Sequence, residues 1–380
     1  MARLVIVCAA VLVVAIGVGI VTSSGPPARP AAGPAPANPT RAGAGTRGAD
    51  QAFESAHSFL GRYELPDGRV VRWDQGGDTV SEGEAYAMLL SVAVGNRPRF
   101  DAAWSWTRAH LLQASGLLAW HWASGGVTGT EPASDADVDA AYALELGAGA
   151  FAEPADLAAA TNLASAIARS ETVALPAGRF LVAGPWAVGP PAYVNPSYGA
   201  PAELAALARL PAEGPTFRAM AAGSRALVSE LLSAGSLPPD WVRLTAGAPL
   251  VASPSPTQSD PYGFDAVRLP IRWAASCDIS DRRAVAGLWL KLGPAARRGR
   301  PTVDLAVHDG SGPQRRGVAS PVGSVAAAAA GWAAGAHADA LSLLARAETQ
   351  NRADPTYYSS AWVALGRVFL QTRRLGTCGA

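Results

Sequence analysis

The stretch Ser81-Glu-Gly-Glu-Ala-Tyr-Ala-Met-Leu-Leu-Ser-Val-Ala-Val94 carries the clearest structural signal in this 380-residue chain. Ser81 and Glu84 form the S-x-x-E pattern of a capping box, in which the serine is the N-cap. Apolar residues then recur at positions 85, 88, 89, 92 and 93, which is the spacing of one helix face. The stretch therefore predicts a helix over 81–94 and favours an all-α fold.

Helical patterns recur through the rest of the chain, joined by loops that contain Pro and Gly. The further predicted helices span residues 51–61, 99–113, 136–147, 154–169, 200–208, 215–234, 264–275, 281–292, 321–332, 336–346 and 358–370. Strand-like pieces, such as 69–73 and 180–182, are short. About twelve helices without a clean sequence repeat favour one closed helical domain over a solenoid.

Composition restricts the class of protein. The chain has 31 Lys+Arg and 30 Asp+Glu, a formal net charge of +1, and 49% hydrophobic residues. This balance argues against a nucleic-acid binder, which relies on clustered Lys and Arg. Three cysteines rule out a disulfide scaffold, and five scattered histidines show no paired metal-ligand spacing. We therefore expect a globular domain with no metal and no cofactor. Eleven tryptophans hint at sugar stacking, although large cores also use Trp.

The N-terminus predicts export. An uncharged apolar run covers Leu4–Val21, and its 18 residues would span roughly 27 Å as a helix, close to a bilayer core. Residues 1–24 are predicted to be either an uncleaved signal anchor or a cleaved signal peptide, and both place the remainder outside the cytoplasm or in the cell envelope. Residues 25–48, rich in Pro, Ala and Gly, predict an extended tether, so the folded domain is expected over 49–380.

Two cysteines follow the apolar run. Cys277 and Cys378 could pair in an oxidising compartment, and two unpaired buried thiols are the alternative.

Acidic residues gather at two predicted helix starts. Glu82 falls in a first turn, where either helix-dipole stabilisation or catalysis explains it. In Ala133-Ser-Asp-Ala-Asp-Val-Asp139, three aspartates exceed what capping by Ser134 or Asp135 requires. Asp135 and Asp139 would share a helix face and need a compensating positive partner. The segment is not an EF-hand, because the Gly and Glu required at its sixth and twelfth positions are missing.

A third acidic position lies in Tyr262-Gly-Phe-Asp-Ala-Val-Arg268. Asp265 and Arg268 are three residues apart, which suits an exposed helix pair. The aromatic and apolar surroundings favour instead a buried acid of an active site.

Together these segments resemble glycoside hydrolase family 8, the family of bacterial endo-β-1,4-glucanases. The resemblance runs from about residue 59 to residue 370, most of the chain beyond the N-terminal segment. The motifs that carry it, in the family's order, are Ser81-Glu-Gly83 with Tyr86 and Met88, Phe100-Asp101 with Trp104 and Trp106, Leu118-Ala-Trp120, Ala133-Ser-Asp-Ala-Asp137 with Ala141-Tyr-Ala143, Asn195-Pro-Ser-Tyr198, and Phe264-Asp-Ala-Val-Arg268. The resemblance implies an (α/α)6 barrel with minor β-hairpin insertions and an inverting hydrolase.

The same match assigns roles. Glu82 is expected to be the general acid, Asp265 the general base, and Asp135 the residue that orients and stabilises the sugar at the cleavage point. An inverting acid and base stand about 6.5–9.5 Å apart. Glu82 must also stay protonated near neutral pH, so burial and Asp135 must outweigh the helix N-terminus.

The match also implies contacts with substrate. Trp120 is expected to be a stacking platform for a sugar ring, and a core Trp is the alternative. Tyr198 and Arg268 are expected to orient the cleavage-site sugar and the base. Three further tryptophans are expected to pack rather than bind sugar: Trp122, Trp186 and Trp273.

This chain departs from the family at Glu84, Ala136 and Ile271, where Gln, Gly and Trp are common, and the last change could reshape a sugar subsite. The expected partner is a β-1,4-linked glucan, cleaved by a monomeric catalytic domain that meets a membrane only through its N-terminal segment. Hydrolysis of chitosan, xylan or mixed-linkage glucan is the alternative, as is a non-catalytic glycan-binding protein.

Overall fold

The computed structural model describes residues 39–233, 235–245, 261–307 and 317–378, and helices dominate this part of the chain. The α-helices are α1 (Pro39–Tyr63), α2 (Ser81–Val94), α3 (Arg97–His110), α4 (Ser134–Phe151), α5 (Pro154–Ser170), α6 (Pro201–Leu207), α7 (Gly214–Ser233), α8 (Arg268–Ala274), α9 (Ile279–Ala286), α10 (Leu288–Arg297), α11 (Pro321–Ala333), α12 (His337–Ala353) and α13 (Tyr357–Gln371).

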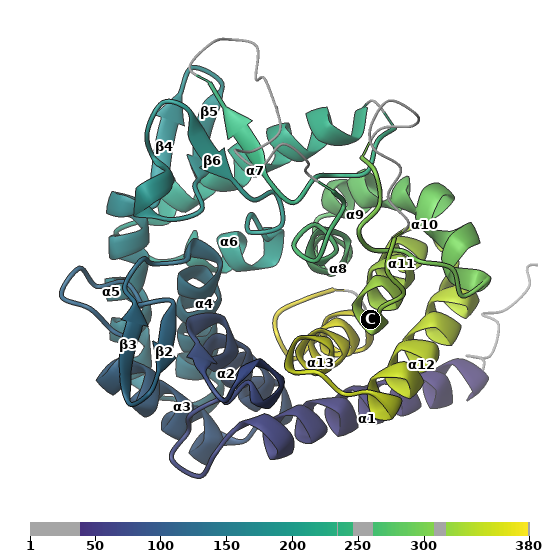
Figure 1. Cartoon of the computed structure of the whole chain (residues 1–380), viewed down its shortest axis with the longest axis horizontal. Coiled ribbons are helices and arrows are strands. Elements are labelled where there is room, and N and C mark those ends of the chain that lie inside the picture. The colour runs from purple at the N-terminus through teal and green to yellow at the C-terminus, as the bar shows by residue number, and fades with distance from the viewer. Residues whose placement is uncertain (1–38, 234, 246–260, 308–316, 379–380) are drawn as a thin grey trace, which may run out of the picture. The chain divides into compact units, whose positions relative to one another are not determined.

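Six of these helices form a closed inner ring (Figure 1). α2 contacts α4, and the contacts continue through α6, α8, α11 and α13 back to α2. The helices between them in the sequence lie outside the ring, so inner and outer helices alternate along the chain. The inner helices α2, α11 and α13 are buried along nearly their whole length, because other helices surround them. Their sequences are accordingly mostly apolar on every side. The predicted (α/α)6 barrel is therefore confirmed.

Helix α1 joins the first and last parts of the barrel. The Ser55 hydroxyl donates to Oε2 of Glu348 on α12 at 2.7 Å, and the Phe59 ring lies 6.1 Å from the Tyr357 ring on α13. α1 begins at Pro39, within the segment that the sequence predicts to be an extended tether, so the last part of that segment is helical.

The N-terminal predictions concern residues outside the described part of the chain. The signal segment, 1–24, and most of the tether lie there. Among the described residues, no helix combines the length and the apolar composition that crossing a bilayer requires.

Short strands lie in the loops between the helices, as predicted. An antiparallel sheet contains β1 (Thr79–Val80), β2 (His121–Ala123) and β3 (Gly126–Gly129). A hairpin consists of β4 (Thr172–Leu175) and β5 (Gly178–Leu181). A second antiparallel pair joins β6 (Ala192–Val194) to β7 (Val242–Leu244), with α6 and α7 between them in the chain. The piece predicted at 180–182 overlaps β5, whereas 69–73 contains only isolated bridges.

The predicted capping box at the start of α2 is wrong. The N-cap is Val80, and no side chain caps the helix. Glu84 is instead fully buried, where its carboxylate accepts hydrogen bonds from the Val70 N–H at 2.7 Å and the Thr107 hydroxyl at 3.4 Å. The S-x-x-E pattern is present, but tertiary partners bind the glutamate.

Two other helix starts differ from the predictions. Neither Ser134 nor Asp135 caps α4, because Ala133 is the N-cap and the Ser134 hydroxyl donates to the Val182 carbonyl at 2.6 Å. The helix predicted over 264–275 begins only at Arg268, since residues 264–267 form a turn.

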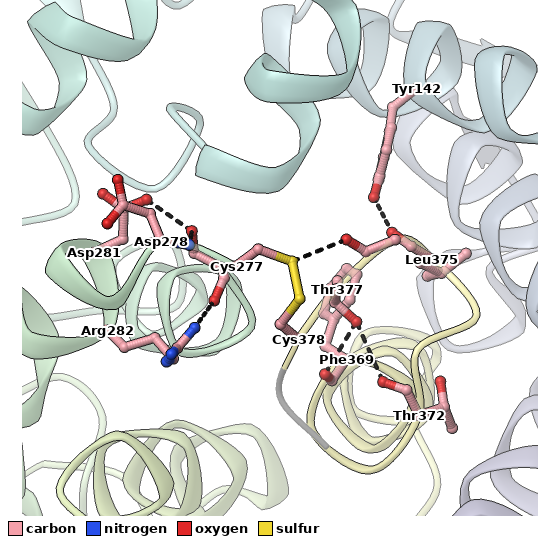
Figure 2. Close-up of a disulfide and its surroundings, with 12 residues drawn as sticks. Tyr142, Cys277, Asp278, Asp281, Arg282, Phe369, Thr372, Leu375, Thr377 and Cys378 are labelled. Carbon is pink, nitrogen blue, oxygen red and sulfur yellow. Dashed lines mark hydrogen bonds between the residues drawn. A yellow bond between two sulfur atoms is a disulfide. The ribbon is translucent and has the colours of Figure 1, made fainter.

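A disulfide between Cys277 and Cys378 anchors the C-terminal segment (Figure 2). Cys277 follows α8, and the Cys378 N–H donates to the Ala275 carbonyl at 2.9 Å. The Tyr142 hydroxyl of α4 donates to the Leu375 carbonyl. The sequence left this pairing open, and the structure shows it.

The residues at the starts of the six inner helices gather at one end of the barrel. Two cavities are lined by residues at, or just before, these starts: Glu82, Ala133, Tyr198, Asp265, Pro321 and Tyr357. Because a helix N-terminus carries partial positive charge, this end of the barrel favours acidic groups.

Candidate active site

Arg268, the first residue of α8, lies at the centre of the candidate site. Its side chain is 1% exposed. Its Nη1 donates to Glu82 Oε1 at 3.0 Å and to Asp135 Oδ2 at 2.9 Å, and its Nη2 donates to Asp265 Oδ1. The three acids come from α2, α4 and the turn before α8. The structure thus brings all three predicted acidic residues to one guanidinium.

Glu82 has a strongly raised pKa. Burial, followed by the negative charge of Asp135, raises its pKa to about 8 against the opposing charge of Arg268. The Tyr86 hydroxyl also lies 3.5 Å from Glu82 Oε1. Burial and Asp135 therefore outweigh the helix N-terminus, as the expected general acid requires, and Glu82 is protonated at neutral pH.

Asp135 and Asp265 differ in exposure. The side chain of Asp135 is 1% exposed. Among the described residues, its Oδ1 has no hydrogen-bond donor other than the neighbouring Glu82 carboxyl group in its protonated form. Asp265 is 33% exposed and faces a cavity. Burial raises the pKa of Asp265, while the charge of Arg268 opposes that rise. The pair with Arg268 helps to keep Asp265 ionised.

A second, deeper ion cluster repeats the first one helical turn later. Arg272 Nη2 donates to Asp139 Oδ2 at 2.7 Å, and its Nη1 also contacts Glu203 of α6. Asp135 and Asp139 therefore each bind an arginine of α8 on the same side of α4. The predicted need for positive partners is confirmed, because Asp135 pairs with Arg268 and Asp139 pairs with Arg272. Both arginines lie on α8.

Two cavities extend from this centre. The larger, of about 790 Å³, contains Glu82 and Asp265, and we call it the acid cavity. The smaller, of about 300 Å³, is lined by Trp120, Trp186, Tyr198 and Trp241, among others, and we call it the tryptophan cavity. The guanidinium carbon of Arg268 lies 5.1 Å from the centre of the Tyr198 ring, so Tyr198 connects the ion cluster to the tryptophan cavity.

Trp120 is held rigidly at the edge of the tryptophan cavity. Its ring is 39% exposed and stacks on His121, with ring centres 4.6 Å apart. Its carbonyl accepts a hydrogen bond from the Ser81 N–H at 3.0 Å, next to Glu82 in the chain. A Cβ at Gly129 would lie 2.1 Å from the Trp120 ring, so only glycine permits this position.

His121, which supports Trp120, is itself fixed on both sides. One ring nitrogen lies 2.8 Å from Asp78 Oδ2, and the other lies 2.7 Å from the Thr128 hydroxyl.

The other tryptophans divide into two groups. The packing prediction holds for Trp273, which is buried, and for Trp122, which is half-buried against Trp106. It is wrong for Trp186, which is 54% exposed and lines the tryptophan cavity. Trp241 lies beside it, with ring centres 6.3 Å apart, and was not predicted. No local pattern marks either residue, because their exposure depends on how the loops meet.

Two of the acids around Arg268 share one cavity wall. Within the described ranges, no group of three or more His, Cys, Asp or Glu could hold a metal ion. Glu82 and Asp265 line the same cavity, and burial raises the pKa of both carboxyl groups. Carboxyl groups brought together in this way are found in enzymes that use paired acids for acid–base chemistry.

Comparison with known proteins then gives the family. The profile described as Glycosyl hydrolases family 8 matches residues 49–367, and the chain belongs to this family. The chain is 30% identical over 223 residues to a probable endoglucanase of Novacetimonas hansenii. That alignment covers 56% of this chain and 64% of the relative, so the chain spans less than two thirds of the relative's length.

Solved structures share the fold. The endo-β-1,4-glucanase CMCax of Acetobacter xylinum is 22% identical with a TM-score of 0.69, over 84% of this chain and 98% of that one. A β-1,3-1,4-glucanase of Paenibacillus sp. X4 is 19% identical with a TM-score of 0.69, over 87% and 92%.

Proposed function

We propose that this protein is an endo-acting glycoside hydrolase that cleaves β-1,4-linked glucan with inversion at the anomeric carbon. The observation that carries the proposal is the contact of Arg268 with Glu82, Asp135 and Asp265, combined with a Glu82 pKa of about 8. Glu82 is thereby protonated at neutral pH, and the charge of Arg268 opposes the rise that burial causes in the pKa of Asp265.

In the proposed reaction, Glu82 donates its proton to the glycosidic oxygen as the bond from that oxygen to the anomeric carbon breaks. Asp265 accepts a proton from a water molecule, whose oxygen attacks the same carbon from the opposite face. Glu82 ends as an anion beside the Arg268 guanidinium, which stabilises that charge. Asp135 accepts hydrogen bonds from the sugar at the cleavage point. Exchange with solvent restores both carboxyl groups.

The two cavities support cleavage inside a chain. The acid cavity contains Glu82 and Asp265, and the tryptophan cavity is lined by Tyr198, whose ring centre lies 5.1 Å from the Arg268 guanidinium carbon. A substrate chain that occupies both cavities would therefore pass the ion cluster. The exposed faces of Trp120 and Trp186 suit the apolar faces of β-linked glucose rings. Tyr198 and Arg268 orient the sugar and the base between the cavities.

The relatives favour cellulose-type glucan. Similar proteins are named endoglucanase, and one similar structure is a β-1,3-1,4-glucanase, so mixed-linkage glucan is the second candidate. We also propose that the chain is exported by way of residues 1–24. The Cys277–Cys378 disulfide supports this, because disulfides persist in oxidising compartments.

The test measures hydrolysis of carboxymethylcellulose, lichenan, xylan and chitosan by the protein and its Glu82→Gln and Asp265→Asn variants. We expect activity on carboxymethylcellulose that falls by about a thousandfold or more in both variants. Asp101→Asn, on the exposed surface of α3, is the matched control and should retain full activity. Viscosity should fall faster than reducing ends appear, as endo cleavage requires.

The second part of the test measures the anomeric configuration of the product. The first product seen by proton NMR should be the α-anomer. A β-anomer would contradict inversion, and activity on chitosan or xylan alone would replace the substrate. Glucan binding without hydrolysis of any polymer would leave the non-catalytic alternative.

A further inference from the structure

Asp240 binds the turn that carries the proposed base. Its Oδ1 accepts hydrogen bonds from three backbone N–H groups, those of Gly263 at 3.0 Å, Asp265 at 3.1 Å and Ala266 at 2.7 Å. The Asp240 N–H in turn donates to the Pro261 carbonyl at 2.9 Å. One of the three donors is the amide of Asp265 itself.

Through these hydrogen bonds Asp240 acts as a helix cap, although it lies in a separate segment of the chain. Residues 263–267 form a helical turn that leads into α8, with the Val267 N–H donating to the Gly263 carbonyl and the Arg268 N–H to the Asp265 carbonyl. The first N–H groups of such a turn have no acceptor within it. Asp240 supplies that acceptor from the segment before β7, about 25 residues earlier.

The fit between Asp240 and the turn is close. A Cβ at Gly263 would lie 2.1 Å from Asp240 Oδ2, so a side chain at this position would displace the carboxylate. Gly263 is buried, and the turn therefore has little room to shift. The position of the Asp265 backbone is set by Asp240, and that of its carboxylate by Arg268.

The surroundings of Asp240 couple its charge to the site. The titratable and charged groups around it are Asp265, Arg268, Tyr262 and Tyr358. Burial raises the pKa of Asp240 to about 6, and the charge of Asp265 also raises it.

We propose that Asp240 is a positioning residue for the general base: it fixes the 263–267 turn so that Asp265 is held against Arg268, opposite Glu82. The proposal rests on the proposed function, in which Asp265 activates the water. Asp240 itself touches no reacting atom.

The experiment compares Asp240→Ala with Asp240→Asn in the full chain. The alanine removes the acceptor, and misplacing a catalytic group by about 1 Å lowers its rate about a hundredfold. We expect kcat on carboxymethylcellulose to fall about a hundredfold in Asp240→Ala, with KM changed less than threefold. The asparagine keeps an oxygen acceptor but loses the charge, so its kcat should fall less than tenfold.

Amide hydrogen exchange across 262–267 gives a readout that does not depend on activity. Protection should be lost in Asp240→Ala and largely kept in Asp240→Asn. Folded Asp240→Ala with kcat within twofold of the wild type would overturn the proposal. So would equal losses of kcat in both variants, which would indicate a purely structural role.

Asp265→Asn separates this proposal from the proposed function. Wild-type activity in that variant would refute Asp265 as the base. An inactive Asp265→Asn beside a fully active Asp240→Ala would refute the positioning role alone. If Asp240→Ala does not fold, Asp240→Asn decides: a fall in kcat of more than tenfold while the 262–267 amides stay protected overturns the proposal.

Discussion

Asp135 and Arg268 form an ion pair at 2.9 Å in which each side chain is only 1% exposed. The pair joins the first turn of α4 to the first residue of α8, two inner helices separated by α6 in the ring. Removing one member would leave the other charge buried without its partner, which is strongly unfavourable. The same contact that assembles the candidate site therefore also contributes to the stability of the barrel.

Replacing Arg268 should affect both stability and the pH profile. Arg268→Gln should lower the free energy of unfolding by about 3–5 kcal/mol, as expected for breaking a buried ion pair. Because Arg268 lowers the pKa of Glu82 and of Asp265, its loss should move both limbs of the pH profile to higher pH. Denaturant titration and kcat/KM against pH provide the measurements.

The matched control for that variant is Arg272→Gln. Arg272 is equally buried in the deeper cluster with Asp139 and Glu203. It should destabilise the protein by a similar amount while leaving both limbs in place. Identical pH profiles for the two arginine variants would contradict the assignment of Arg268 to the acid–base centre.

Hydrolysis should follow a bell-shaped pH profile. Activity is expected to fall as pH rises through about 8, because Glu82 then loses the proton that it must donate. It should also fall on the acid side, at a pH above the ordinary pKa of an aspartate, since burial raises the pKa of Asp265. Initial rates between pH 4 and 10, corrected for enzyme stability, are the measurement. A basic limb well below pH 7 would be incompatible with Glu82 as the acid.

Stability should depend on pH through the same glutamate. The pKa of Glu82 is raised from 4.5 to about 8 by folding, so the folded state binds more protons than the unfolded state between these values. The free energy of unfolding should therefore decrease as pH rises from about 4.5 to 8. In Glu82→Gln that contribution to the slope should disappear. Melting temperatures of the two proteins at matched pH values would reveal it, and parallel curves would contradict it.

The disulfide should stabilise the protein without taking part in activity. Cys277 and Cys378 are 101 residues apart in the sequence, and closing loops of this length typically contributes about 2–4 kcal/mol. The double variant Cys277→Ser, Cys378→Ser should lose about that much stability while kcat stays within twofold, since Cys277 follows the end of α8 opposite Arg268. Reductant should destabilise the wild type but not the double variant. An unchanged melting temperature would rule out the contribution.

The tryptophan cavity should govern affinity for glucan. Trp120→Ala and Trp186→Ala should each raise KM on soluble oligosaccharides by about five- to tenfold, corresponding to about 1 kcal/mol of lost stacking. Their kcat should change less. Trp332→Ala, near the C-terminal end of α11 against His337, is the control and should leave KM unchanged. An unaltered KM in Trp186→Ala would show that its exposed ring does not meet substrate.

Much of the fold could be read from the sequence. The apolar spacing over 81–94 predicts α2 with its observed bounds, and the further helical patterns predict one closed helical domain. The resemblance to glycoside hydrolase family 8 adds the (α/α)6 barrel. Local spacing suffices here because a helix repeats every 3.6 residues. Helix starts were less predictable: Ser81 and Ser134 resemble caps, yet tertiary contacts determine what Glu84 and Ser134 bind.

The candidate site divides in the same way. The sequence by itself determined which carboxyl groups are available, because Glu82, Asp135 and Asp265 each lie in a motif, and that Asp135 and Asp139 need positive partners. Only the tertiary structure decided that Arg268 meets all three acids, that Trp186 and Trp241 share a cavity, and that Asp240 holds the turn of Asp265. The physical reason is that burial, charge proximity and ring exposure arise where segments distant in the chain meet. The local spacing of apolar and polar residues therefore cannot predict them.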